Sequence, residues 1–274
     1  MSSIESPENA ADDLVDFLNA SPTPWHAVAE ARRRLIANGF VELNERVSFQ
    51  IAPGGRYVVV RGGGSIAALI AGSQSPSATG FRWIGAHTDS PNLRLKLLPM
   101  SVRGNNHVVS SEVYGGVLLH TWLDRDLSVG GKVIVSTPAG LETRLVRRDG
   151  IAKIPSLAIH LDRQVNQDGL KVNPQDDLAA LTALALGEKA PEISLASWLG
   201  LDPLGNGAKL HAFDLAFFDS QPASRVGHQQ EYISSGRLDN LAMCHAALSA
   251  LLSGSSTAKS TQGIVLFDHE ECGS

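Results

Sequence analysis

The middle of the chain is a long run of strand-like segments separated by glycine turns, and this pattern restricts the fold more than any other feature. The sequences on either side combine helical spacing with short apolar strands, which is typical of an α/β domain. Within the middle segment one helix is predicted, from Pro174 to Leu186. We therefore predict an α/β domain made of residues 1–93 and 226–274, interrupted by an inserted, mostly-β domain of residues 94–225.

The flanking segments supply the expected elements of the α/β domain. Helices are predicted for residues 10–20, for a second segment ending near Ala37, and for residues 240–252; strands are predicted for residues 57–60, 66–70, 81–84 and 263–267. The glycines at 62–64 favour a hairpin turn over a phosphate-binding loop, because no Gly-Lys-Ser/Thr follows them. Neither an apolar run of about 20 residues nor an N-terminal signal segment is present, so we expect no membrane insertion or secretion.

Three polar clusters lie at the ends of predicted elements. Glu270 and Glu271 follow an apolar strand, and Gly273 permits a sharp exit that could aim both carboxylates at one cleft. The segment 85–91 follows another apolar strand, and the segment 236–240 opens a helix. We expect these three ends to converge on one site.

The residue types in the clusters suit a hydrolase with two divalent metal ions. His87 is expected to bind one ion and Asp239 to bridge both, because a shared carboxylate offsets the repulsion between two cations. Asp89 is placed to bond the other ring nitrogen of His87. One of the two glutamates should bind metal, and the other should act as the general base.

Each residue also has a purely structural interpretation. His87 alone could be a satisfied polar residue at a strand end, Asp239 a helix cap, and the two glutamates a solvated turn. Cys272 is interpreted as an apolar filler rather than a nucleophile. From spacing alone, both interpretations stay open.

Charge and cysteine content exclude other classes of protein. The net charge of −5 comes from interspersed signs without a basic stripe, which argues against nucleic acid or an anionic membrane surface as a partner. The two cysteines, Cys244 and Cys272, form neither a zinc-like nor a disulfide-like pattern. A reduced, cytoplasmic setting is therefore expected.

Six motifs in order resemble the aspartyl aminopeptidases, a family of dinuclear zinc exopeptidases that assemble as tetrahedral dodecamers. The motifs cover residues 20–28 (ASPTPWHAV), 85–91 (GAHTDSP), 120–127 (HTWLDRDL), 154–161 (IPSLAIHL), 235–241 (SGRLDNL) and 267–274 (FDHEECGS). The resemblance extends over almost the whole chain. It implies an α/β domain of the zinc-exopeptidase type, with an inserted dimerisation domain.

The resemblance also implies roles for individual residues. His87 and Glu271 would bind different zinc ions, Asp239 would bridge them, Glu270 would be the general base and Asp89 its supporting acid. His160, which otherwise reads as a buried strand histidine, resembles the histidine that reaches into the active site of a neighbouring subunit. The implied substrates are peptides with N-terminal Asp or Glu, and the implied partners are further copies of the chain in a homo-oligomer.

The chain departs from the family in two ways. Cys272 replaces the usual valine, which should change packing only mildly. Family members also continue beyond the position of Ser274, and their later part carries an aspartate and a histidine that complete the two metal shells. We therefore expect the 274-residue segment alone to bind zinc weakly. The alternatives to an aminopeptidase are a catalytically incomplete fragment that keeps the assembly domain, and another metal-dependent amide hydrolase such as a carboxypeptidase or deacylase.

Overall fold

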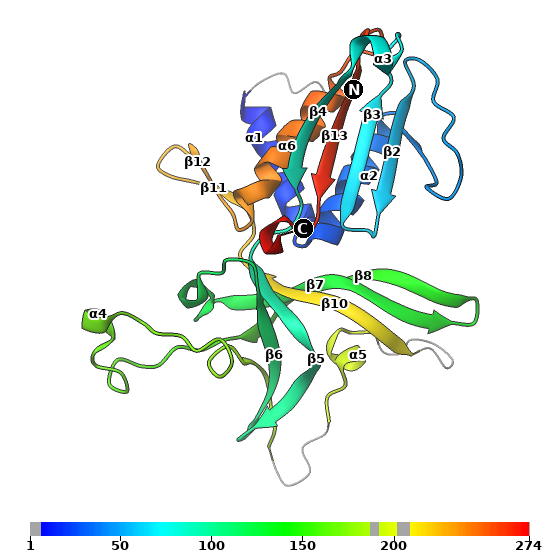
Figure 1. Cartoon of the computed structure of the whole chain (residues 1–274). Coiled ribbons are helices and arrows are strands. Elements are labelled where there is room, and N and C mark those ends of the chain that lie inside the picture. Colours follow the sequence, from blue (N-terminus) through cyan, green and yellow to red (C-terminus); the bar gives the residue numbers. More distant parts are fainter. Residues whose placement is uncertain (1–6, 187–191, 202–208, 274) are drawn as a thin grey trace. The chain divides into compact units, whose positions relative to one another are not determined.

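The computed structural model describes residues 7–186, 192–201 and 209–273, and the chain forms two compact units (Figure 1). The first unit combines residues 1–90 with residues 223–274, and the second consists of residues 91–222. The observed boundaries are thus at Ser90/Pro91 and Pro222/Ala223, where the sequence pattern predicted 93/94 and 225/226. In the described residues no helix combines the length and apolar character that crossing a membrane requires.

A five-stranded sheet forms the centre of the first unit. Its strands are β1 (Val41–Glu42), β2 (Arg56–Arg61), β3 (Ser65–Ile70), β4 (Phe81–His87) and β13 (Thr261–Phe267), in the spatial order β1-β2-β3-β13-β4. β2 and β3 pair as an antiparallel hairpin, which confirms the turn predicted from the glycines at 62–64. β4 and β13 run parallel to each other, and their last residues, His87 and Phe267, lie opposite one another.

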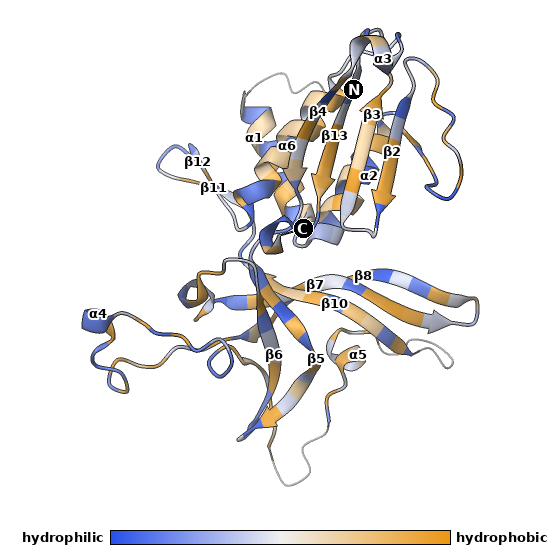
Figure 2. Cartoon of the chain, in the orientation of Figure 1, coloured by the Kyte–Doolittle hydropathy of each residue, from blue (hydrophilic) through white to orange (hydrophobic). Residues whose placement is uncertain are grey.

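The unit has three long helices: α1 (Pro7–Ala20), α2 (Pro24–Ala37) and α6 (Leu238–Leu252). α2 and α6 pack on the sheet, and α1 packs against these two helices. In Figure 2 hydrophobic colour covers most of β3, the middle of β2 and the part of β13 nearest its carboxyl end. Ile66 of β3 lies in one buried core with Leu35 of α2 and Leu248 of α6. Burial of this apolar surface is the main force that holds helices and sheet together. All three helices were predicted from their spacing and are confirmed.

The second unit is a closed antiparallel barrel. Its strands are β5 (Asn92–Arg103), β6 (Asn106–Tyr114), β7 (Asp126–Thr137), β8 (Gly140–Lys153), β9 (Ala180–Leu184) and β10 (Leu210–Asp219), in the order β10-β5-β6-β9-β8-β7. Leu93 near the start of β5 lies opposite Phe217 near the end of β10. The first and last strands of the unit are therefore neighbours, and both residues are in its core.

The prediction of a helix from Pro174 to Leu186 is wrong. Residues 180–184 form strand β9, which pairs with β6, and the preceding residues form turns. Ala180 is fully buried in the barrel core, as is Leu178 just before the strand. The alanines and leucines of this segment have high helix propensity, but pairing and burial in the barrel outweigh that local preference.

Gly131 provides a test of the barrel's packing. It lies in β7 with φ +148, and a Cβ atom there would be 2.1 Å from the carbonyl oxygen of Asp214 on β10. Gly131→Ala should therefore lower the free energy of unfolding by about 3 kcal/mol, from backbone strain and overpacking together. Gly116→Ala is the matched control, because a Cβ atom at Gly116 would have nothing within 4 Å. Urea denaturation gives the free energy of unfolding of both variants. Equal denaturation midpoints for the two would contradict the prediction.

Candidate metal centre

The candidate site lies at the carboxyl ends of β4 and β13. These strands are parallel neighbours, so the segments that follow them leave the sheet at the same edge, where ligand sites of open α/β sheets are found. The N–H of Thr88 donates a hydrogen bond to the carbonyl oxygen of Phe267 over 2.6 Å. This bond joins the segment after β4 to the segment after β13.

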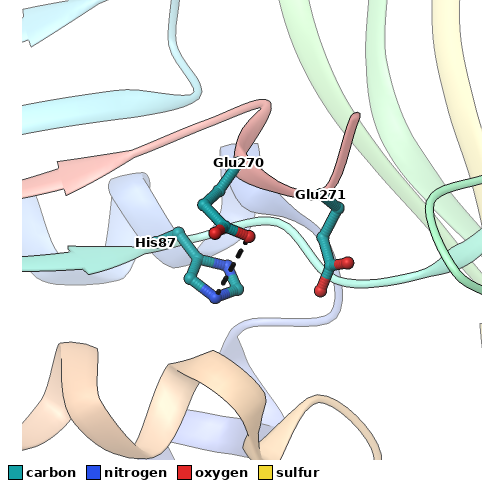
Figure 3. Close-up of side chains that lie close together, drawn as sticks. All are labelled: His87, Glu270 and Glu271. Atoms are coloured by element: carbon teal, nitrogen blue, oxygen red, sulfur yellow. Dashed lines mark ion pairs between the residues drawn. The ribbon is translucent and has the colours of Figure 1, made fainter. Parts of the chain in front are cut away.

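A tight turn brings Glu270 and Glu271 to the same side of the chain. Side chains of adjacent residues in a strand would point to opposite faces. Here His269 adopts a left-handed conformation, with φ 69, and residues Glu270–Cys272 form the short 3₁₀ helix η2. The turn thus begins before the glutamates, not at Gly273 as expected from the sequence. Figure 3 shows both carboxyl groups directed toward the side where the ring of His87 lies.

The structure brings together residues from all three polar clusters. Nε2 of His87 lies 3.4 Å from Oδ1 of Asp239 and 3.8 Å from Oε2 of Glu270. Potential ligand atoms of His87, Glu270 and Glu271 all lie within 4.8 Å of one another. The His87 side chain is only 11% exposed, whereas that of Asp239 is 88% exposed, so the carboxylate of Asp239 is open to solvent.

Asp89 contacts both His87 and the glutamate turn. Its side chain is fully buried, and Oδ1 lies 3.4 Å from Nδ1 of His87. The backbone carbonyl of Asp89 is closer to the same nitrogen, at 3.1 Å. Oδ2 of Asp89 accepts a hydrogen bond from the N–H of Glu271 over 3.1 Å. The residue therefore orients the imidazole with its carbonyl and holds the turn with its carboxylate.

Asp239 precedes the regular part of α6. The backbone angles of Asp239 (φ −85, ψ 111) and Asn240 (φ −119, ψ 23) are not helical, although the predicted helix follows directly. The carboxylate lies near His87, and among the described residues no hydrogen bond links it to a helix N–H. The geometry thus favours the site over the helix-cap interpretation of this residue.

The electrostatics of the site are dominated by carboxylates. Loss of solvent raises the pKa of Glu271, and the nearby charges of Asp89, Glu270 and Asp239 raise it further, while His87 opposes them. The carboxylates of Asp239, Glu270 and Glu271 lie around one imidazole, and a divalent cation would offset the repulsion between them. Imidazole and carboxylate are also the ligands that zinc accepts. The donor set therefore fits a divalent metal centre.

Two further residues hold the segment after β4, and the sequence did not identify either. Sγ of Cys244 in α6 donates to the carbonyl of His87 at 3.0 Å, and burial raises the pKa of this thiol to about 12, so the donor proton is retained. Arg237 donates to the carbonyl of Thr88. Burial lowers the pKa of its guanidinium to about 10, so the group stays charged at neutral pH. Arg237 lies inside the motif of residues 235–241, and this position was the only hint in the sequence that it matters. Its hydrogen-bond partners could not be predicted, because they depend on the tertiary fold.

Two residues singled out in the sequence are not part of this cluster. His160 belongs to the second unit, where it is exposed in the segment between β8 and the short helix α4 (Val165–Asp168), so the interpretation as a buried strand residue is wrong. Its role in trans stays a prediction. Cys272 is exposed, so it does not fill the core as an apolar residue, and that expectation is also wrong.

Comparison with known proteins assigns the chain to a family. Residues 17–274 match the family described as aminopeptidase I zinc metalloprotease (M18). A probable M18 family aminopeptidase 2 from Pseudomonas aeruginosa is 45% identical over 264 residues, which are 95% of this chain and 61% of that relative. The chain thus spans about three fifths of the length of this relative.

Solved structures agree with the sequence comparison. The structure of Chaetomium thermophilum mApe1 superposes with a TM-score of 0.86 at 32% identity, covering 98% of this chain and 64% of that one. The S. cerevisiae mApe1 dodecamer shares the fold, with a TM-score of 0.79 at 24% identity, covering 97% of this chain and 62% of that one. The resemblance drawn from the six motifs is confirmed, and the chain belongs to the M18 family of zinc metalloproteases, the aspartyl aminopeptidase family.

Proposed function

We propose that the protein carrying this sequence is a metal-dependent aminopeptidase that releases N-terminal acidic residues, Asp or Glu, from peptides. The observation that carries the proposal is the convergence of His87, Asp239 and the glutamate pair at one edge of the sheet. Family membership supports the aminopeptidase reaction, and the resemblance to aspartyl aminopeptidases supports the acidic preference.

The ligands proposed for two zinc ions are His87, Asp239 and Glu271. His87 and Glu271 would bind different ions, and Asp239 would bridge them because its exposed carboxylate lies against Nε2 of His87. When bound, such ions supply Lewis acidity for the scissile carbonyl and make a water acidic enough to lose a proton near neutral pH.

Glu270 is proposed as the general base. Its side chain is 61% exposed and lies beside the imidazole, so it can reach a water in the open part of the site. It would accept the proton of the attacking water and pass it to the leaving amine. Asp89 is proposed to support catalysis indirectly. Its contacts with His87 and with the N–H of Glu271 hold both residues in place.

The second unit is proposed to be a dimerisation domain within a larger homo-oligomer. One solved relative that shares the fold is described as a dodecamer. A cytoplasmic setting is proposed as well, and it is consistent with two cysteines that are both free.

The proposed role of His160 in trans predicts complementation between inactive subunits. Glu270→Gln and His160→Ala should each be inactive alone. Mixed dimers should recover part of the activity, because each contains one site with an intact Glu270 and an intact His160 from the partner. Mass measurement confirms that mixed oligomers have formed. If they form without any activity, His160 does not act in trans.

The proposed function is tested by metal content and by substrate choice. In a full-length context, the purified protein should contain two zinc ions per chain and release Asp from the N-terminus of a short peptide. The same peptide with an acetylated N-terminus should not be cleaved, and a peptide beginning with Ala should be cleaved more slowly. Cleavage of the acetylated peptide would indicate a different amide hydrolase. Absence of both zinc and turnover would indicate a catalytically incomplete protein.

A further inference from the structure

Two segments that are far apart in the sequence carry His87 and Asp239, and a small set of hydrogen bonds holds them together. Oγ of Ser90 lies 2.8 Å from the carbonyl oxygen of Asp239 and 2.7 Å from that of Asp89. In the opposite direction, a guanidinium nitrogen of Arg237 donates to the carbonyl of Thr88. The two segments thus exchange bonds directly beside the residues that approach each other in the site.

Arg237 has a geometry suited to fixing these segments. One terminal nitrogen, Nη2, donates to the carbonyl of Thr88, and the other, Nη1, donates to the carbonyl of Ser21 between α1 and α2. The residue is partly buried, and its backbone is left-handed, with φ 63, which directs the chain into Asp239. A guanidinium presents its donors in a rigid fork, so two simultaneous bonds fix both acceptors relative to each other.

The acceptors indicate what the contact does. Both hydrogen-bond acceptors are uncharged backbone carbonyls, so these two bonds fix the path of the chain. The guanidinium also interacts electrostatically with the carboxylates of Asp89 and Asp268. Hydrogen bonds from a charged donor are roughly twice as strong as neutral ones. Thr88 is flanked by His87 and Asp89, so a shift at its carbonyl would displace both.

We propose that Arg237 is a positioning residue that holds the His87–Ser90 segment against Asp239, with Ser90 making the reciprocal bond. This inference rests on the proposed metal centre for its consequence, which is that Arg237 sets the affinity for zinc without touching the ion. Groups that orient metal ligands typically change metal affinity by about 10- to 100-fold.

A purely structural role for Arg237 would be to tie the α1–α2 turn to the rest of the unit. Arg225 offers a matched control for that role. It donates to the carbonyl of Glu8 in α1 over 2.7 Å and pairs with Asp12 at 2.8 Å. It therefore anchors the N-terminal helix with a similar arginine–carbonyl bond, and the partners of these two interactions lie outside the His87–Ser90 segment.

The test compares Arg237→Met, Arg237→Lys, Ser90→Ala and Arg225→Met in the whole chain. The first measurement is amide hydrogen exchange in the zinc-free protein, at Thr88, which bonds to Phe267, and at Glu271, which bonds to Asp89. The second is the Kd for zinc, by competition with a chromophoric chelator. Thermal unfolding shows how far each variant is destabilised overall.

Arg237→Met should accelerate exchange at both amides and weaken zinc binding by roughly tenfold or more. Arg237→Lys should lie in between, because one ammonium cannot hold both carbonyls in the same way. Ser90→Ala should change both readouts in the same direction. Arg225→Met should lower the melting temperature while exchange at the two amides and the zinc Kd stay as in the unmodified protein.

The proposal is overturned if folded Arg237→Met keeps the exchange rates of the unmodified protein, or if Arg225→Met changes them equally. Should Arg237→Met fail to fold, the exchange rates of Arg237→Lys and Ser90→Ala are compared with those of the unmodified protein instead. Unchanged rates in both variants would overturn the proposal. If the unmodified protein binds no zinc, the proposed metal centre is rejected, and amide exchange still decides whether Arg237 positions the segment.

Discussion

In a full-length context, replacing Glu270 by glutamine is expected to reduce kcat by roughly 10²–10⁴-fold while both metal ions stay bound. The amide has almost the shape of the carboxylate but cannot accept the proton of the attacking water. Glu270 is suited to this role because it lies beside His87 while most of its side chain is exposed. Steady-state turnover of an Asp-peptide and metal content per chain are the two measurements.

The neighbouring variant Glu271→Gln serves as the comparison for Glu270→Gln. Both side chains leave the same 3₁₀ turn, but Glu271 is the proposed ligand, so its replacement should lower metal content as well as turnover. The assignment of the base is wrong if Glu270→Gln turns over close to the rate of the unmodified protein. It is also wrong if the two variants lose metal equally.

Replacing Asp239 by alanine should remove both ions. A bridging carboxylate is shared, so its loss takes a ligand from each ion, and affinity should fall by more than about 100-fold for both. His87→Ala takes a ligand from one ion only, so it should leave about one ion per chain. Metal analysis after dialysis against dilute zinc distinguishes the two variants. Equal metal content in both would contradict the bridging role.

The long helices and the main strands of the first unit could be predicted from local patterns, whereas its short elements, such as β1, were not predicted. Apolar residues at helical spacing predicted the helices, and short apolar runs bounded by glycine predicted β2, β3 and β13. The candidate site could be located because its residues lie at the ends of these elements. The parallel pairing of β4 with β13, which makes those ends meet, is a long-range property that no local pattern contains.

The errors arose where tertiary structure decides local structure. The segment containing β9 has helix-forming residues, yet it is a strand because the barrel buries Leu178 and Ala180. The direction of the glutamate pair depends on the left-handed conformation of His269, a residue that gives only weak sequence signal for such a turn. The contacts of Arg237 with Ser21 and Thr88 join segments distant in sequence, so the motif could mark the residue without showing its partners.

The pairing of Leu93 with Phe217 has a consequence for the order of folding. The first unit is made of two chain segments separated by residues 91–222, so its core cannot close until the chain has looped back. A folded barrel brings its own first and last strands together. It thereby replaces a flexible loop of about 130 residues with a short tether and lowers the entropy cost of closure by roughly 2 kcal/mol. We therefore expect the barrel to fold first and the residues of the candidate metal centre to come together last, with refolding of the first unit slowed by any mutation that delays the barrel.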